Sequence, residues 1–131
     1  MAIGYKVVLL VDKNLLSIRI PTNSGTILYK RNQWAEPEKD CGPLSVFKRL
    51  KYALKFSKSL SSHYALYEIW KCEYVKSDFK KFWNKFDSVE TVPEGTDFAD
   101  KVKIIIPCVQ VVTVNENNVK VNKLPYKIRG V

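Results

Sequence analysis

Four lysines recur at a spacing that would place them along one side of a helix. They are Lys48, Lys51, Lys55 and Lys58, in the stretch VFKRLKYALKFSKSL. At about 100° per residue they fall within a sector of about 80° and extend over about 15 Å of helix. Such a row of ammonium groups could bind successive phosphates, with Tyr52 beside it to stack on a base or sugar. The alternative is an ordinary solvated helix face, although no Glu or Asp stands four residues from any of these lysines.

A second basic and aromatic stretch follows in SDFKKFWNKF. Its four aromatic residues recur at helical spacing, which predicts one apolar helix face packed in the core. These aromatic residues are Phe79, Phe82, Trp83 and Phe86. Three lysines elsewhere on the helical wheel would extend the positive surface: Lys80, Lys81 and Lys85. The functional alternative is that Trp83, and with it Trp34, stacks on a base.

Residues for catalysis are sparse. His63 is the single histidine, which excludes any metal motif built on two histidines. Cys41 precedes the predicted first helix, where a helix N-terminus would lower a thiol pKa, but no known nucleophile signature surrounds it. The carboxylates of 36–40 and 94–100 lie in predicted loops, which favours solvation and turn roles. No phosphate-binding glycine loop or nucleophile elbow is present. The sequence therefore favours a non-catalytic protein with no metal and no cofactor.

Strand and helix patterns indicate how these residues are positioned. Three short segments rich in β-branched and aromatic residues predict an antiparallel meander: Tyr5–Val11, Leu15–Ile20 and Thr26–Lys30. Turn residues separate them, at 12–14 and 21–25. The stretch Trp34–Leu44 contains prolines and a glycine and is predicted to be a loop. Ser45 is then the expected N-cap of a helix over about 46–60.

The second half of the chain continues the alternation. We predict a strand over Tyr64–Lys76, a short helix capped by Ser77, an acidic loop over 87–100 and a strand over Lys101–Val114. Pro107 suggests that this last strand lies at an edge, carries a bulge or breaks in two. A turn at 115–118 leads to a final strand, Val119–Leu124. The order β-β-β-α-β-α-β-β predicts a single α+β domain over 1–131, with two helices packed on one face of a mostly antiparallel sheet.

Charge is the strongest compositional signal. The 131 residues carry a net charge of +9, and 46–86 alone contributes +7 together with eleven of the sixteen aromatic residues. Five carboxylates gather in 87–100, where they could shield a basic surface or serve only as a solvated loop. Three scattered cysteines argue against a disulfide framework. With no signal-peptide pattern and no apolar stretch long enough to cross a bilayer, we expect a cytoplasmic protein that does not bind membranes.

Several motifs together resemble a known small domain. They are the opening YKVV, Trp34 before a proline-containing loop, VFKRLKYALKF, EIWKCEY and PEGTDFADKVKIII. This combination is similar to a domain without an assigned activity in phage and bacterial proteins. The resemblance implies a phage or mobile-element accessory protein, in that case working in the host cytoplasm, and implies no functional residue.

Two functions remain open. The first is a non-catalytic module that binds an anionic partner, nucleic acid or a phosphate-bearing nucleotide, through the lysine-rich helix face. The second is an accessory protein that acts by protein–protein interaction, for instance an inhibitor that binds an acidic host protein. An exposed edge strand near Pro107 or in 119–124 could serve such contacts, or pair with a second copy of the chain to form a homo-oligomer.

Overall fold

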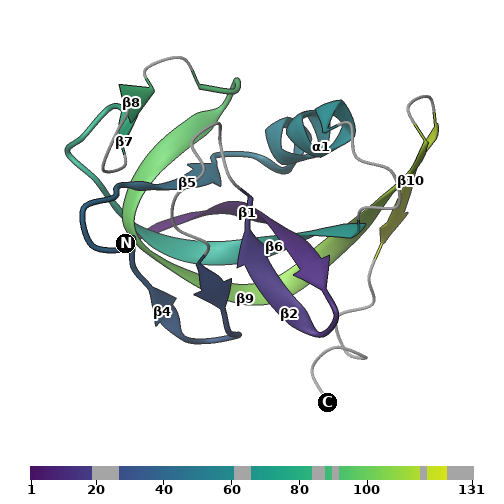
Figure 1. The fold of residues 1–131 in the computed structure, drawn as a ribbon, viewed down its shortest axis with the longest axis horizontal. Coiled ribbons are helices and arrows are strands. Elements are labelled where there is room, and N and C mark those ends of the chain that lie inside the picture. Colours follow the sequence, from purple (N-terminus) through teal and green to yellow (C-terminus); the bar gives the residue numbers. More distant parts are fainter. Residues whose placement is uncertain (19–26, 61–65, 84–87, 90–91, 116–117, 124–131) are drawn as a thin grey trace.

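The computed structural model describes residues 1–18, 27–60, 66–83, 88–89, 92–115 and 118–123, which form an antiparallel sheet, a two-stranded ribbon and one helix (Figure 1). The eight strands of the sheet are β1 (Ala2–Val11), β2 (Asn14–Ser17), β3 (Leu28–Tyr29), β4 (Trp34–Ala35), β5 (Leu44–Phe47), β6 (Leu66–Lys76), β9 (Thr96–Asn115) and β10 (Asn118–Lys123). The ribbon pairs β7 (Phe82–Trp83) with β8 (Ser88–Val89), and α1 spans Leu50–Ser59. The predicted mostly antiparallel sheet is confirmed.

The sheet closes on itself around β6. One edge of β6 pairs with β1 and the other with the long strand β9. β5 then joins these two strands, pairing with β1 through Phe47 and Tyr5 and with the start of β9 over 96–99. The circuit β1–β6–β9–β5 is thus a small barrel. β2 and β3 extend it along β1, whereas β4 and β10 extend it along β9.

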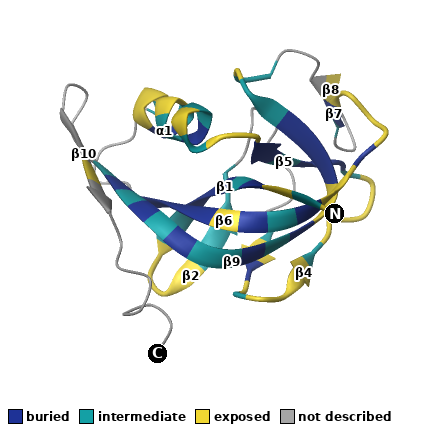
Figure 2. Cartoon of the chain, turned by 180° about the vertical axis from the view of Figure 1, so that it is seen from behind, coloured by how far each residue is buried: buried dark blue, intermediate teal, exposed yellow. Residues whose placement is uncertain are grey.

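Strand alternation divides the apolar residues between two cores. Lys6, Val8, Trp70 and Cys72 face the barrel interior with Tyr29. The opposite face of the same strands, which includes Val7 and Ile69, packs against α1. Figure 2 shows the resulting alternation of buried and less buried residues along β6 and β9. The helix therefore covers part of the outer surface of the barrel.

The predicted meander is confirmed within the described residues, since β1, β2 and β3 pair in order. Asp12 adopts a left-handed conformation at φ 56° in the turn between the first two strands, a conformation that Asp tolerates better than most residues. The predicted strand over 64–76 is also confirmed from Leu66 onward.

The first helix is present but begins later than predicted. Residues Leu44–Phe47 pair with β9 instead of opening the helix, and Val46 and Phe47 are buried there. Arg49, not Ser45, is the N-cap residue. The apolar spacing of 46–54 fits both a strand end and a helix start, and burial against β9 decides for the strand at 46–47. Lys48 consequently lies in the bend before α1.

The predicted second helix is wrong. The cap signal is real, since the Ser77 Oγ accepts a hydrogen bond from the Phe79 N–H at 3.1 Å, but no helix follows it in the described residues. The Trp83 N–H and C=O instead bond with those of Gly42, at 2.7 and 3.0 Å. Phe82 packs on Phe98 with ring centroids 4.6 Å apart. Aromatic residues have strong strand propensity, and these long-range partners override the helical spacing.

Two predicted loops also contain strands. In the first, predicted over 34–44, Trp34 and Ala35 pair with β9. The second, predicted over 87–100, includes β8 and the first residues of β9.

Of the alternatives for Pro107, a bulge is the one observed. Pro107 pairs with Trp70 while Val109 pairs with Ile69, so Cys108 is the extra residue. Pro107 does not lie in an edge strand; within the described residues β3 and β10 end the strand order. Among the residues that the structure describes, no helix has the length and hydropathy needed to span a membrane.

Candidate anion-binding surfaces

The lysines of the first helix point away from the core. α1 buries Ala53 and Ser57 against the sheet, and its leucines pack on the second core. This anchoring leaves Lys51, Lys55 and Lys58 exposed on the helix, and Lys48 exposed in the bend before it. The structure therefore supports one basic surface at α1, which we call the α1 lysine face: Lys48, Lys51, Lys55 and Lys58.

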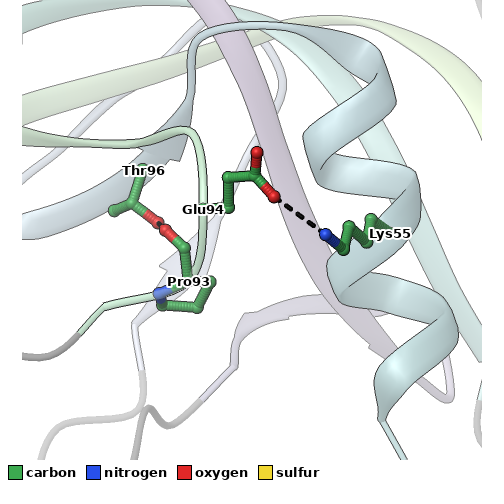
Figure 3. A network of polar contacts seen from close by, with 4 residues as sticks. All are labelled: Lys55, Pro93, Glu94 and Thr96. Carbon is green, nitrogen blue, oxygen red and sulfur yellow. Dashed lines mark hydrogen bonds and ion pairs between the residues drawn. The ribbon is translucent and has the colours of Figure 1, made fainter.

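One lysine of this face is neutralised by a residue distant in sequence. The Lys55 Nζ donates a hydrogen bond to the Glu94 Oε2 at 2.8 Å (Figure 3). This bond lowers the pKa of the Glu94 carboxyl and raises that of the Lys55 ammonium. A tight turn holds the glutamate in place, because the Thr96 Oγ1 donates to the Pro93 carbonyl at 2.6 Å. The acidic segment thus does contact the basic surface, through this ion pair and through the Lys48 N–H, which donates to the Gly95 carbonyl at 2.9 Å.

Tyr52, one of the three predicted stacking residues, is partly covered by the turn at 93–96. Its ring lies against Gly95, and the Lys51 Nζ sits 5.0 Å from the ring centroid. The side chain is half-buried. Tyr52 therefore packs the turn at 93–96 against α1.

The second predicted group of lysines lies apart from α1 in sequence and in structure. Lys80 and Lys81 are exposed in the segment before β7, and Lys85 lies outside the described residues. Trp83 is half-buried, with Phe79 edge-on at 4.6 Å between ring centroids. Of the four aromatic residues expected in the core, Phe82 is buried, Phe79 is 54% exposed and Phe86 is outside the described residues.

Trp34 is the most accessible of the three predicted stacking residues. Its side chain is 40% exposed and borders a surface cavity of about 260 Å³. The other lining residues are Ile27, Leu28, Lys30, Gln33, Ala35 and Glu36. Trp34 lies opposite Lys103 in the register of β4 and β9, and the Lys103 Nζ sits 4.8 Å from the ring centroid. This arrangement of an exposed ring, a cavity and cationic side chains was not expected for a residue placed in a loop.

A row of side chains crosses four strands beside this cavity. Ile3 pairs with Glu73, Glu73 with Lys103, and Lys103 with Trp34. Directly opposed residues lie on the same side of a sheet. The Lys103 Nζ lies 3.2 Å from the Glu73 Oε2, and in the next row Lys101 pairs with Glu36 at 3.3 Å. Ile3 is exposed, so α1 does not cover this part of the sheet face.

A polar group inside the barrel was missed at the sequence level. The Lys6 Nζ donates to the Ser45 carbonyl at 2.6 Å and to its Oγ at 3.2 Å, and lies 5.3 Å from the ring centroid of Tyr29. Burial lowers the pKa of Lys6 to about 8, although a charge on nearby Cys72 would act in the opposite direction. The alternation of YKVV places Lys6 on the same strand face as Val8, which was the available signal.

The predicted acidic loop contains a buried carboxylate. The Tyr74 hydroxyl donates to the Asp97 Oδ2 at 2.7 Å, and the Phe98 N–H donates to Oδ1 at 3.0 Å. Burial alone would raise the pKa of Asp97, but these hydrogen bonds, with Lys76 and Lys48 nearby, lower it below its ordinary value. Asp97 therefore has a structural role, in place of the solvation or turn role expected for it.

Nothing at the cysteines indicates a nucleophile. Cys41 lies nine residues before the first residue of α1, not directly ahead of the helix as predicted. Burial raises the pKa of Cys72 to about 12, which disfavours the reactive thiolate. His63 lies outside the described residues. Among those that are described, no three His, Cys, Asp or Glu side chains gather as a metal site would require.

In comparisons with known proteins, no family model, no curated protein and no solved structure matches this chain. The resemblance to a phage and bacterial domain therefore stays a prediction, and so does the cytoplasmic location.

Proposed function

We propose that the protein is a non-catalytic module that binds nucleic acid through the α1 lysine face. One observation carries the proposal: Lys48, Lys51 and Lys58 are exposed on and beside one helix, and none forms an ion pair with a described residue. Unpaired cations that already lie together can contact phosphates and release counterions without first breaking a salt bridge. The net charge of +9 favours the same partner.

The contact is expected to be electrostatic and independent of base sequence. α1 is ten residues long, and three of its four exposed side chains are lysines, which contact phosphates as flexible point charges. About three phosphate contacts predict a log–log slope of affinity against salt of about −2 to −3. Fluorescence anisotropy with a labelled oligonucleotide at several salt concentrations measures this slope.

A charge-reversal pair tests the proposal. Lys51→Glu with Lys58→Glu should abolish most binding at low salt, because two attractive contacts become repulsive. The matched control is Lys13→Glu with Lys39→Glu, which makes the same charge change at exposed positions away from α1. Equal weakening by both pairs would show that only net charge matters, and would contradict a site at α1.

The alternative proposal is an accessory protein that acts on an acidic partner protein. The observation that favours it is the sheet edge: β3 pairs only with β2, and β10 only with β9, among the described strands. Such edges can accept a strand from another protein or from a second copy of this chain. Absence of binding to any oligonucleotide at low salt would favour this alternative. Analytical ultracentrifugation would test self-association.

A further inference from the structure

Trp34 is exposed in a way that the packing of the core does not require. Its neighbour Ala35 packs on the barrel core, whereas the indole lies on the outer side with Lys103. By contrast, Trp70 is buried and donates a hydrogen bond to Glu68 at 3.0 Å. An indole left in water forfeits a large hydrophobic gain, which makes an exposed one a candidate contact residue.

The backbone under this ring is held firmly. The Gln33 N–H bonds to the Lys30 carbonyl at 3.1 Å, which closes a turn just before β4. The Asn32 N–H donates to the Ile104 carbonyl at 2.8 Å, and the Arg31 Nε donates to the Ile105 carbonyl at 2.9 Å. The turn is thereby tied to β9, which positions Trp34 before any ligand arrives. Preorganised supports of this kind favour binding sites.

The surroundings of the ring match a base attached to a phosphate. Lys103 lies over the ring and is itself held by Glu73, so one side of the indole is occupied by a fixed cation. The lining of the adjoining cavity includes the apolar Leu28 and the polar side chains of Gln33 and Glu36. Lys30 also lies in this lining. Amide and carboxylate groups can bond the edge of a base, and an ammonium can bond its phosphate.

The size of the cavity limits the ligand. Its volume of about 260 Å³ is just below the range of about 300–1,000 Å³ typical of sites that enclose a whole small molecule. One base is therefore a better match than a complete dinucleotide. A duplex keeps its bases stacked inside, so only a single strand or a loop can present a base to the ring.

We infer that Trp34 is the base-stacking residue of this protein and that the adjoining cavity takes one unpaired base of a single-stranded nucleic acid. This inference rests on the proposed function, because the phosphates of the same strand supply most of the affinity. It adds a preference for single strands over duplex, which a lysine row alone does not provide.

The test compares two labelled strands of about twenty nucleotides, oligodeoxythymidylate and an abasic strand of equal length. Trp34→Ala should weaken binding of oligodeoxythymidylate by about 5- to 100-fold, the range for loss of one stacked base. Trp34→Phe should retain most of the affinity. The abasic strand should bind the unmodified protein about as weakly as oligodeoxythymidylate binds Trp34→Ala. The matched control is Phe79→Ala, which removes another exposed aromatic ring and should change nothing.

The outcomes separate the two proposals. If Trp34→Ala binds like the unmodified protein while reversal of Lys51 and Lys58 weakens binding, the stacking site is refuted and the proposed function stands. If no strand binds the unmodified protein at low salt, the proposed function itself fails. Should Trp34→Ala not fold, tryptophan quenching by oligodeoxythymidylate decides: it must disappear in Trp34→Phe and persist in Trp83→Phe, and the reverse result overturns the inference.

Discussion

Gly95 lies so close to the ring of Tyr52 that a Cβ atom placed on the glycine would be 2.2 Å from the Tyr52 Cγ. Gly95 also has φ +80°, a conformation that L side chains rarely adopt. This contact fixes the turn that carries Glu94 against α1.

Gly95→Ala should therefore destabilise the fold by about 1–3 kcal/mol, as overpacking and backbone strain typically do. Urea denaturation followed by tryptophan fluorescence measures the change. Tyr52→Ala with Gly95→Ala should recover the part of the steric loss that comes from the ring. It should keep the part that comes from φ and from the Cβ of residue 52, which a Cβ on Gly95 would approach to 2.6 Å. If the double variant is no better than the sum of the single ones, the close contact is not the cause.

Glu94→Gln should strengthen nucleic-acid binding at low salt. It removes the carboxylate that forms an ion pair with Lys55 at 2.8 Å. Lys55 can then contact phosphate together with the other three lysines of the α1 lysine face. One additional phosphate contact should steepen the log–log salt slope by about one unit. The control is Glu38→Gln, which makes the same charge change at an exposed carboxylate that is not in the lining of the Trp34 cavity. An unchanged slope in Glu94→Gln would show that Lys55 does not contact phosphate.

Lys6 should make stability depend on pH between pH 7 and pH 9. Burial lowers the folded-state pKa of Lys6 to about 8 from an ordinary 10.5, so above pH 8 the unfolded chain binds a proton that the folded chain has lost. The free energy of unfolding should then rise by about 1 kcal/mol from pH 7 to pH 9. Above this window the Cys72 thiol has the opposite effect, because burial raises its folded-state pKa to about 12.

Lys6→Met should remove this rise, whatever its effect on absolute stability. Lys13→Met, at an exposed turn position, should retain it. Urea titrations at pH 7, 8 and 9 give the free energy of unfolding at each pH. The change with pH is then compared between the unmodified protein, Lys6→Met and Lys13→Met. A rise that persists in Lys6→Met would assign the pH dependence to another group.

Tyr74→Phe should destabilise the protein by about 1.5–3 kcal/mol, the usual value for a hydrogen bond to a charged group. It removes the 2.7 Å bond to Asp97, which helps to lower the pKa of that carboxyl. Stability from a lowered carboxyl pKa is present at neutral pH and is lost as pH falls through the folded-state pKa. Between pH 7 and pH values below 4, Tyr74→Phe should accordingly lose less unfolding free energy than the unmodified protein does. Tyr5→Phe, a half-buried tyrosine on β1, is the control.

Local patterns predicted the elements that depend on local interactions. The meander β1–β2–β3, the strand β6 and the body of α1 follow from alternation, turn residues and helical spacing in short segments. The segment containing Phe82 and Trp83 has helical spacing too, but its partners are Gly42 and Phe98, which no local pattern reveals. Where two periodicities fit one segment, distant contacts decide between them.

The candidate site divides in the same way. The exposure of Lys51, Lys55 and Lys58 followed from helical spacing, whereas Lys48 lies in the bend before α1. The bond from Lys55 to Glu94 spans 39 residues, which no local pattern reveals. The sequence predicts Trp34 as a stacking residue because it is aromatic, but its pairing with Lys103 depends on a strand within a predicted loop. The burial of Lys6 is not predicted, because lysine is seldom buried.

The long strand β9 has a consequence for how the chain folds. It pairs with β4, β5, β6 and β10, so most of the sheet is completed only by residues 96–115. These contacts join segments far apart in sequence, which predicts a high contact order and slow folding. During synthesis, the apolar faces of β1, β5 and β6 cannot be fully buried until β9 has left the ribosome. The barrel can therefore close only after residues 96–115 have been synthesised.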